Sequence, residues 1–155
     1  MRRWLILAGR LLLAAVFLYA AYSKLRPPIH PPPPLSVSLS LFAMQIDSYQ
    51  LLPAWAVSPL ARTLPFLELA LGILLLIGWP LRLVAGVTSA LLLVFFGVML
   101  RTYLKGLEIN CGCFGPGETL SWKTLLRNGL LLGVSFALSV AAFRAPRGQT
   151  QEVMH

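Results

Sequence analysis

Long apolar runs, separated by short polar connections, dominate the pattern of positions along the chain. Four of these runs are long enough for a helix to cross the hydrocarbon core of a bilayer, which takes about 20 residues. The pattern therefore predicts an all-α fold, an integral membrane four-helix bundle. Its expected spans cover about residues 4–24, 63–79, 81–104 and 121–143.

The first apolar run carries a charge and allows a second interpretation. Arg10 lies inside the run, so its side chain has to snorkel to the interface or face another helix. The basic start of the run and the small residues Ala20 and Ala21 are also typical of a cleaved signal peptide. We favour a membrane span because the run is long for the apolar region of a signal peptide.

The connection between the first and second spans has two parts. "PPIHPPPP", Pro27 to Pro34, should form a short extended polyproline segment. Residues at helical spacing then follow: Leu39, Phe42, Ala43, Ile46 and Gln50. They predict a short amphipathic interfacial helix after the first span, from about Ser38 to Leu52, although "LSVSLS" leaves an extended start open. Pro53 should end this helix, and Pro65 suits the first turn of the second span.

Composition supports the membrane class and narrows the partners. Apolar residues make up 57% of the chain and charged residues 12%, which is about half the charged share of a typical soluble domain. The net charge of +8 comes from single cations at the ends of apolar runs, so it indicates a lipid bilayer as partner and no nucleic acid. We expect one membrane domain over residues 1–143 and a disordered polar tail over residues 144–155.

Four spans bring distant residues to one end of the bundle. Both termini should lie on one side of the membrane, and the connections after the first and third spans on the other. Lys24, Glu68, Arg101 and Arg127 should then converge on the loop that follows the third span. We interpret these four residues as a charge cluster that shapes a site.

The orientation is not decided by the positive-inside rule, because the two sides carry nearly equal numbers of cations. The Arg2–Arg3 pair before the first span favours cytoplasmic termini. We therefore expect a multi-pass protein of the cell (inner) membrane, with the loop after the third span on the outer, periplasmic side. Disulfides form and persist on that side.

That loop, "EINCGCFGPGE", holds the only two cysteines of the chain, Cys111 and Cys113. In one interpretation they cycle between dithiol and disulfide as the catalytic pair. Gly112 would give the small ring its backbone freedom, and nearby cations would favour the reactive thiolate. We also assign Gly112, Phe114 and Gly115 to the geometry of the loop.

Two other interpretations of the cysteines stay open. The pair could bind a soft metal such as copper or zinc, but two thiolates are too few for a closed zinc site. Of the two histidines, only His30 is expected on the same side, because His155 lies in the tail. We therefore assign no metal ligands. The thiols could also be incidental.

Glu68 is the one acidic residue expected inside a span. A carboxylate in a membrane is costly and is usually paired or functional. It could carry protons or hold a cation at the site. It could equally form a salt bridge with Lys24, Arg101 or Arg127 that only stabilises the bundle.

Several stretches together resemble one family of membrane proteins. They are "CGCFG" (Cys111 to Gly115), "YSKL" (Tyr22 to Leu25), "YQLLP" (Tyr49 to Pro53), "LPFLELALG" (Leu64 to Gly72) and "LLRN" (Leu125 to Asn128). The chain resembles the MauE family of methylamine utilisation proteins, which belongs with the DoxX-like four-helix membrane proteins, from about Trp4 to Phe143. The polyproline segment departs from the pattern of that family.

The resemblance implies a thiol–disulfide role in the maturation of exported redox proteins. In methylamine utilisation the client is the disulfide-rich small subunit of methylamine dehydrogenase, and a thioredoxin-like protein is a partner. Because this chain has one cysteine pair, its electron acceptor must be external: a thioredoxin-like protein or a membrane quinone. The alternatives are a non-enzymatic chaperone or assembly factor with a structural CxC, and a copper- or zinc-handling protein.

Overall fold

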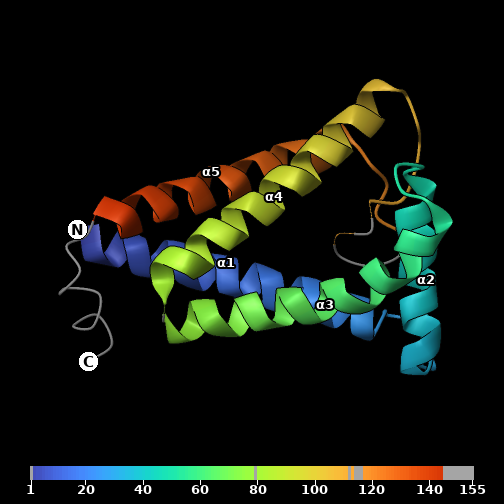
Figure 1. The fold of residues 1–155 in the computed structure, drawn as a ribbon, viewed down its shortest axis with the longest axis horizontal. Coiled ribbons are helices and arrows are strands. Elements are labelled where there is room, and N and C mark those ends of the chain that lie inside the picture. The colour runs from blue at the N-terminus through green and yellow to red at the C-terminus, as the bar shows by residue number, and fades with distance from the viewer. Residues whose placement is uncertain (1, 79, 112, 114–116, 145–155) are drawn as a thin grey trace.

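The computed structural model describes residues 2–78, 80–111, 113 and 117–144. Within this part the chain forms helices and connecting loops, with one isolated β-bridge, which confirms the all-α class. The helices are α1 (Arg2–Leu25), α2 (Leu35–Ser48), α3 (Ala54–Ile77), α4 (Leu81–Leu104) and α5 (Trp122–Arg144), as labelled in Figure 1.

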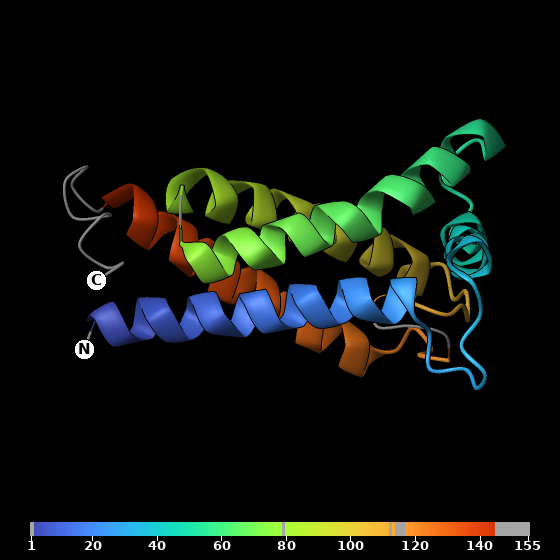
Figure 2. The same ribbon diagram turned by 90° about the horizontal axis from the view of Figure 1, so that it is seen from below.

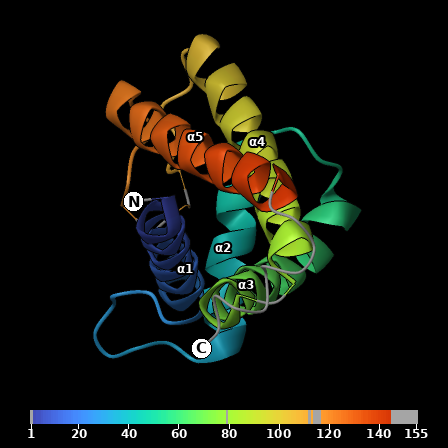
Figure 3. The same cartoon turned by 90° about the vertical axis from the view of Figure 1, so that its left-hand side faces the viewer.

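The four long helices lie along one another, and α2 crosses one end of their bundle (Figures 1 and 2). The start of α1 and the end of α5 lie at the opposite end from α2. The connection from α4 to α5, which contains the cysteines, lies at the α2 end. Viewed along the bundle, α1 lies beside α3, and α4 beside α5 (Figure 3). The structure therefore has the two-ended arrangement that counting spans predicts.

Helices α1, α3, α4 and α5 are each long and apolar enough to cross a membrane, with mean hydropathy between 1.6 and 2.5. Many of their large apolar side chains point outward, among them Leu93 and Phe136. Such a surface needs a lipid environment rather than water. The chain is a multi-pass membrane protein.

Helix α2 differs from the expected interfacial helix in its bounds and in its contacts. It begins at Leu35, directly after Pro34, and the "LSVSLS" stretch is helical rather than extended. It ends before Gln50, whose φ of 51° is incompatible with a continuing helix. Phe42 is buried against Ala61 and Leu64 of α3, so α2 is docked on the protein.

Helix α3 begins earlier than the expected start at Thr63. It starts at Ala54, after Pro53, so Pro53 precedes this helix and α2 has already ended. Pro65 lies well inside α3 rather than in its first turn. A proline removes a backbone hydrogen bond, but transmembrane helices tolerate that loss where neighbouring groups compensate. The prediction that Pro65 marks the first turn of the second span was therefore wrong.

Arg10 faces another helix instead of snorkelling. Its Nε donates to the carbonyl of Leu75 at 2.8 Å, and one terminal nitrogen donates to that of Leu76 at 2.9 Å. These carbonyls belong to the last turn of α3, where backbone acceptors lack intrahelical partners. Gly78 follows with a φ of 82° and packs so closely on the guanidinium that a Cβ there would lie 2.6 Å from it. Arg10 therefore joins α1 to the end of α3.

Candidate functional site

The connection from α4 to α5 contains the cysteines and one short antiparallel pairing. Asn110 and Thr119 form an antiparallel bridge. On either side of this bridge, the Cys111 amide donates to the carbonyl of Glu118 at 2.7 Å, and the Leu120 amide donates to that of Ile109 at 2.8 Å. These bonds hold the backbone of Cys111 in place. Gly112, Phe114 and Gly115, which we assigned to loop geometry, lie outside the described residues.

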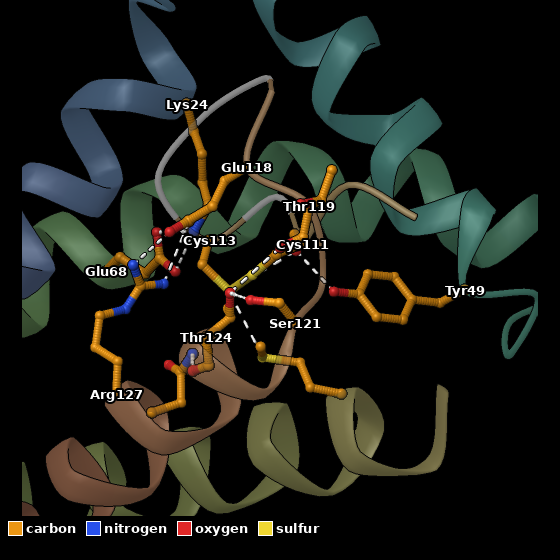
Figure 4. Close-up of a disulfide and its surroundings, with 12 residues drawn as sticks. Lys24, Tyr49, Glu68, Cys111, Cys113, Glu118, Thr119, Ser121, Thr124 and Arg127 are labelled. Carbon is orange, nitrogen blue, oxygen red and sulfur yellow. Dashed lines mark hydrogen bonds and ion pairs between the residues drawn. A yellow bond between two sulfur atoms is a disulfide. The ribbon is translucent and has the colours of Figure 1, made fainter. Parts of the chain in front are cut away.

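Cys111 and Cys113 are joined by a disulfide (Figure 4), and the two residues differ in burial. Cys111 is only 4% exposed and packs with Met99, Leu120 and Leu125. Cys113 is half-buried, and its sulfur lies 3.7 Å from that of Met99. Cys113 is therefore the more exposed of the two residues. The sequence placed both cysteines in a polar loop, but the loop folds back on the bundle and buries Cys111.

Tyr49, which follows the last residue of α2, binds the backbone of the disulfide loop (Figure 4). Its hydroxyl donates to the Cys111 carbonyl at 2.7 Å. Burial of the phenol, and secondarily the nearby negative charge of Glu118, raises the pKa of Tyr49 to about 12. The hydroxyl therefore stays protonated, and able to donate, throughout the physiological pH range.

Lys24 and Glu68 form a buried ion pair between α1 and α3. The Lys24 ammonium lies 2.5 and 2.6 Å from the two carboxylate oxygens, and the side chains are 3% and 5% exposed. The rings of Phe42 and Phe95 lie 5.0 and 5.8 Å from the ammonium, within the range of a cation–π contact. Aromatic rings and a single carboxylate thus surround the charge of Lys24.

The other two members of the expected charge cluster are placed differently. Arg127 pairs with Glu118 of the cysteine loop, through both terminal nitrogens of its guanidinium. It thereby ties α5 to the residue whose carbonyl receives the Cys111 amide. Arg101 is exposed on α4. The structure therefore brings Lys24 and Glu68 together, uses Arg127 to hold the loop, and leaves Arg101 at the surface.

A cavity of about 300 Å³ opens at this end of the bundle. All five helices and the cysteine loop contribute to its wall, and most lining side chains are apolar. Cys111, Cys113, Lys24, Glu68 and Tyr49 are all among the lining residues. We call this space the bundle-end cavity. It is the feature that places the disulfide and the buried ion pair around one common volume.

Sequence reasoning gave no role to three residues that help to build the site: Tyr49, Glu118 and Met99. Tyr49 lies within "YQLLP", one of the stretches that carry the family resemblance, but nothing in that stretch indicates a bond to the cysteine loop. Glu118 lies after the cysteines in the same loop. An acidic residue so near the expected cations is the one signal that could have indicated an ion pair there. Met99 looks like any other apolar residue of a span, so no local signal distinguishes it.

Metal ligands do not gather in the part of the chain that the structure describes. Over residues 2–78, 80–111, 113 and 117–144, no group of three His, Cys, Asp or Glu side chains could hold an ion. The site that the structure describes contains a disulfide, a buried ion pair and an apolar cavity. The fold and the site together define a multi-pass helical membrane protein with a disulfide loop at one end.

Comparison with known proteins gives the family. The sequence model described as "Methylamine utilisation protein MauE" matches residues 2–142, which is most of the chain. The chain belongs to the MauE family. No solved structure matches it at a significant level.

Individual relatives agree with this assignment. The methylamine utilization protein MauE of Paracoccus denitrificans is 34% identical over 136 residues, covering 85% of this chain and 67% of that protein. The MauE protein of Methylophilus methylotrophus is 35% identical over 112 residues, covering 72% of this chain and 53% of that protein. That of Paracoccus versutus is 31% identical over 149 residues, covering 94% and 74%. The matches thus span between about half and three quarters of the relatives' own lengths.

Proposed function

We propose that the chain is a thiol–disulfide redox component of the bacterial inner membrane that acts in the maturation of exported proteins. The observation that carries this proposal is the asymmetric cysteine pair. In the Cys111–Cys113 disulfide, Cys113 is half-buried and Cys111 is buried. The rate of thiol–disulfide exchange depends on access to the sulfur that is attacked, so this difference favours attack at Cys113.

A thiolate of the partner attacks the Cys113 sulfur, the Cys111–Cys113 bond breaks, and Cys111 leaves as a thiolate. The partner's second thiol then attacks the mixed disulfide and releases Cys113. The partner gains a disulfide, and Cys111 and Cys113 become a dithiol. The reverse sequence would reduce a partner's disulfide.

The names of the relatives support a setting for this activity. Because they are methylamine utilization proteins, we propose a client of the methylamine dehydrogenase small-subunit type and a thioredoxin-like partner. The cysteine loop lies at the end of the bundle away from the chain start. With cytoplasmic termini, this end faces the periplasm, where such clients mature.

Trapping of a mixed disulfide tests the proposal. In Cys111→Ser the free Cys113 thiol can attack the disulfide of an oxidised partner, as in the reverse sequence, but the Cys111 thiol that would release that partner is missing. The partner should therefore accumulate on Cys113 as a reductant-sensitive adduct, found by non-reducing electrophoresis and mass spectrometry. Cys113→Ser is the matched control and should give far less adduct, because Cys111 is buried. Absence of adducts from both variants, together with normal client maturation, would refute the redox function.

A second candidate function is supported by the packing of Cys111. Its contacts with Met99, Leu120 and Leu125 are those of a structural residue, which fits an assembly factor that holds a client without redox chemistry. In that case, a Cys111→Ala/Cys113→Ala double variant that still folds would mature the client normally. Under the redox proposal the same variant fails to do so.

A further inference from the structure

The bundle-end cavity reaches the membrane-facing surface of the protein. Leu60 of α3 and Val94 of α4 line it, and they are 37% and 63% exposed on helices that face lipid. A molecule dissolved in the bilayer could therefore enter sideways between α3 and α4. The cavity has a volume of about 300 Å³, at the small end of the range for ligand sites. It therefore suits the ring of a lipid-soluble molecule whose tail stays in the bilayer.

The wall of the cavity combines three kinds of group. Cys111 and Cys113 supply a redox pair. Phe42 and Phe95 supply aromatic rings, which favour stacking on another flat ring. Lys24 supplies an ammonium with three donors, two of which reach Glu68, so its third is suited to a carbonyl oxygen of a ligand.

We propose that the bundle-end cavity binds the ring of a membrane quinone, which oxidises the reduced Cys111/Cys113 pair. This inference rests on the proposed thiol–disulfide function and names the electron acceptor for it. A quinone is lipid-soluble, flat and capable of accepting electrons, and it carries carbonyl oxygens. It therefore matches each of the groups on the wall.

The reaction balances without another reagent. The dithiol loses two electrons and two protons as its two S–H bonds break and the Cys111–Cys113 bond forms. The quinone gains them as two O–H bonds and leaves as a quinol. The disulfide is thereby restored and can again accept electrons from the thiols of a partner. Lys24 is a positioning residue in this scheme, since it orients and polarises a ring oxygen and neither gains nor loses electrons.

Turnover with a short-tailed quinone tests the inference. The purified full-length protein is reduced with dithiothreitol, freed of reductant under anaerobic conditions, and mixed with decylubiquinone or a short-chain menaquinone. Both rings are fully substituted, so thiols do not add to them. We expect one quinol for every two thiols lost, followed by quinone absorbance and by alkylation of the remaining thiols.

A matched pair of variants on α4 tests the location. Val98 lines the cavity, and Leu93 is 59% exposed and does not line it. A Trp side chain in place of Val98 would occupy part of the cavity and exclude the ring, so Val98→Trp should slow quinone reduction about tenfold or more. Leu93→Trp should leave the rate unchanged. Both variants should still exchange disulfides with a reduced thioredoxin-like protein.

A photoreactive azidoquinone gives a test that needs no variant. It should label peptides of α3 and α4, and excess decylubiquinone should suppress that labelling. Labelling that decylubiquinone does not compete away would mean that the azidoquinone reacts without a specific site, and would overturn the inference. So would a dithiol that exchanges with the thioredoxin-like protein but is oxidised by neither quinone. A pair that exchanges with no protein would instead overturn the proposed function itself.

Discussion

At the scale of single residues, the site depends on a few polar groups that the membrane environment makes costly to leave unpaired. Lys24 is buried against Glu68, and Tyr49 is turned toward the Cys111 carbonyl. A buried charge is tolerated when its partner and hydrogen bonds compensate the lost hydration, and removal of one partner leaves the other uncompensated. Glu68 thus forms the expected salt bridge, with Lys24. Because it also lies on the cavity wall, a role at the site remains open to it.

Glu68→Gln should destabilise the protein by about 3–5 kcal/mol, because the Lys24 ammonium stays buried without its counter-charge. The double variant Lys24→Met/Glu68→Gln should regain most of that loss, since no unpaired charge remains. Unfolding in a denaturing detergent series measures both. The double variant should also reduce quinone more slowly than the wild type, because it lacks the ammonium donor. Wild-type stability in Glu68→Gln would contradict the buried pair.

Tyr49→Phe should cost about 1 kcal/mol of stability, the usual value of one hydrogen bond. The pKa of Tyr49 rises from 10.0 to about 12 on folding. The stabilising effect is therefore complete below about pH 10 and is lost as the pH rises through about 12. The difference in tyrosinate absorbance between wild type and variant should show one phenol ionising in that upper range. Ionisation at the ordinary pKa would contradict the burial of this phenol near Glu118.

At the scale of elements, close helix packing and the crossing helix α2 position the site. Helices α1 and α3 pack closely at Gly72, where a Cβ would lie 2.8 Å from the Leu18 side chain. The same two helices carry Lys24 and Glu68. The separation of α1 and α3 therefore bears directly on the geometry of the ion pair.

Gly72→Ala should force α1 and α3 apart and destabilise the bundle by about 1–3 kcal/mol, the usual cost of overpacking. Gly97→Ala on α4 is the matched control, because nothing lies within 4 Å of a Cβ at that position. Thermal unfolding in detergent should show a lower midpoint for the first variant and almost no change for the second. Equal midpoints would show that Leu18 can move aside.

At the scale of the whole molecule, four spans place the chain start and the cysteine loop at opposite ends. The proposed orientation then exposes Cys113 to the periplasm. After mild reduction of intact cells, a membrane-impermeant maleimide should label Cys113 faster than Cys111, which is buried. Cys113→Ser should remove most of the label. Labelling only after lysis would reverse the orientation.

The sequence by itself determined the class of this protein and which residues lie at each end of the bundle. Hydropathy over four long runs is a local property, so it predicted the spans without any knowledge of packing. The parity of the spans then placed Lys24, Glu68 and the cysteines at one end. The beginnings of α2 and α3 were predicted less well, because prolines start helices in some contexts and are tolerated inside them in others.

Only the tertiary structure decided how the residues at that end are paired and what they enclose. Glu68 had three candidate cations, and the approach of α1 to α3 selects Lys24, whereas Arg127 meets Glu118. The different burial of Cys111 and Cys113 arises from a loop that folds back on Met99, which no local pattern specifies. The cavity depends on side chains from five helices at once. Distances between segments far apart in the chain are set by packing, so pairings and cavities appear only in three dimensions.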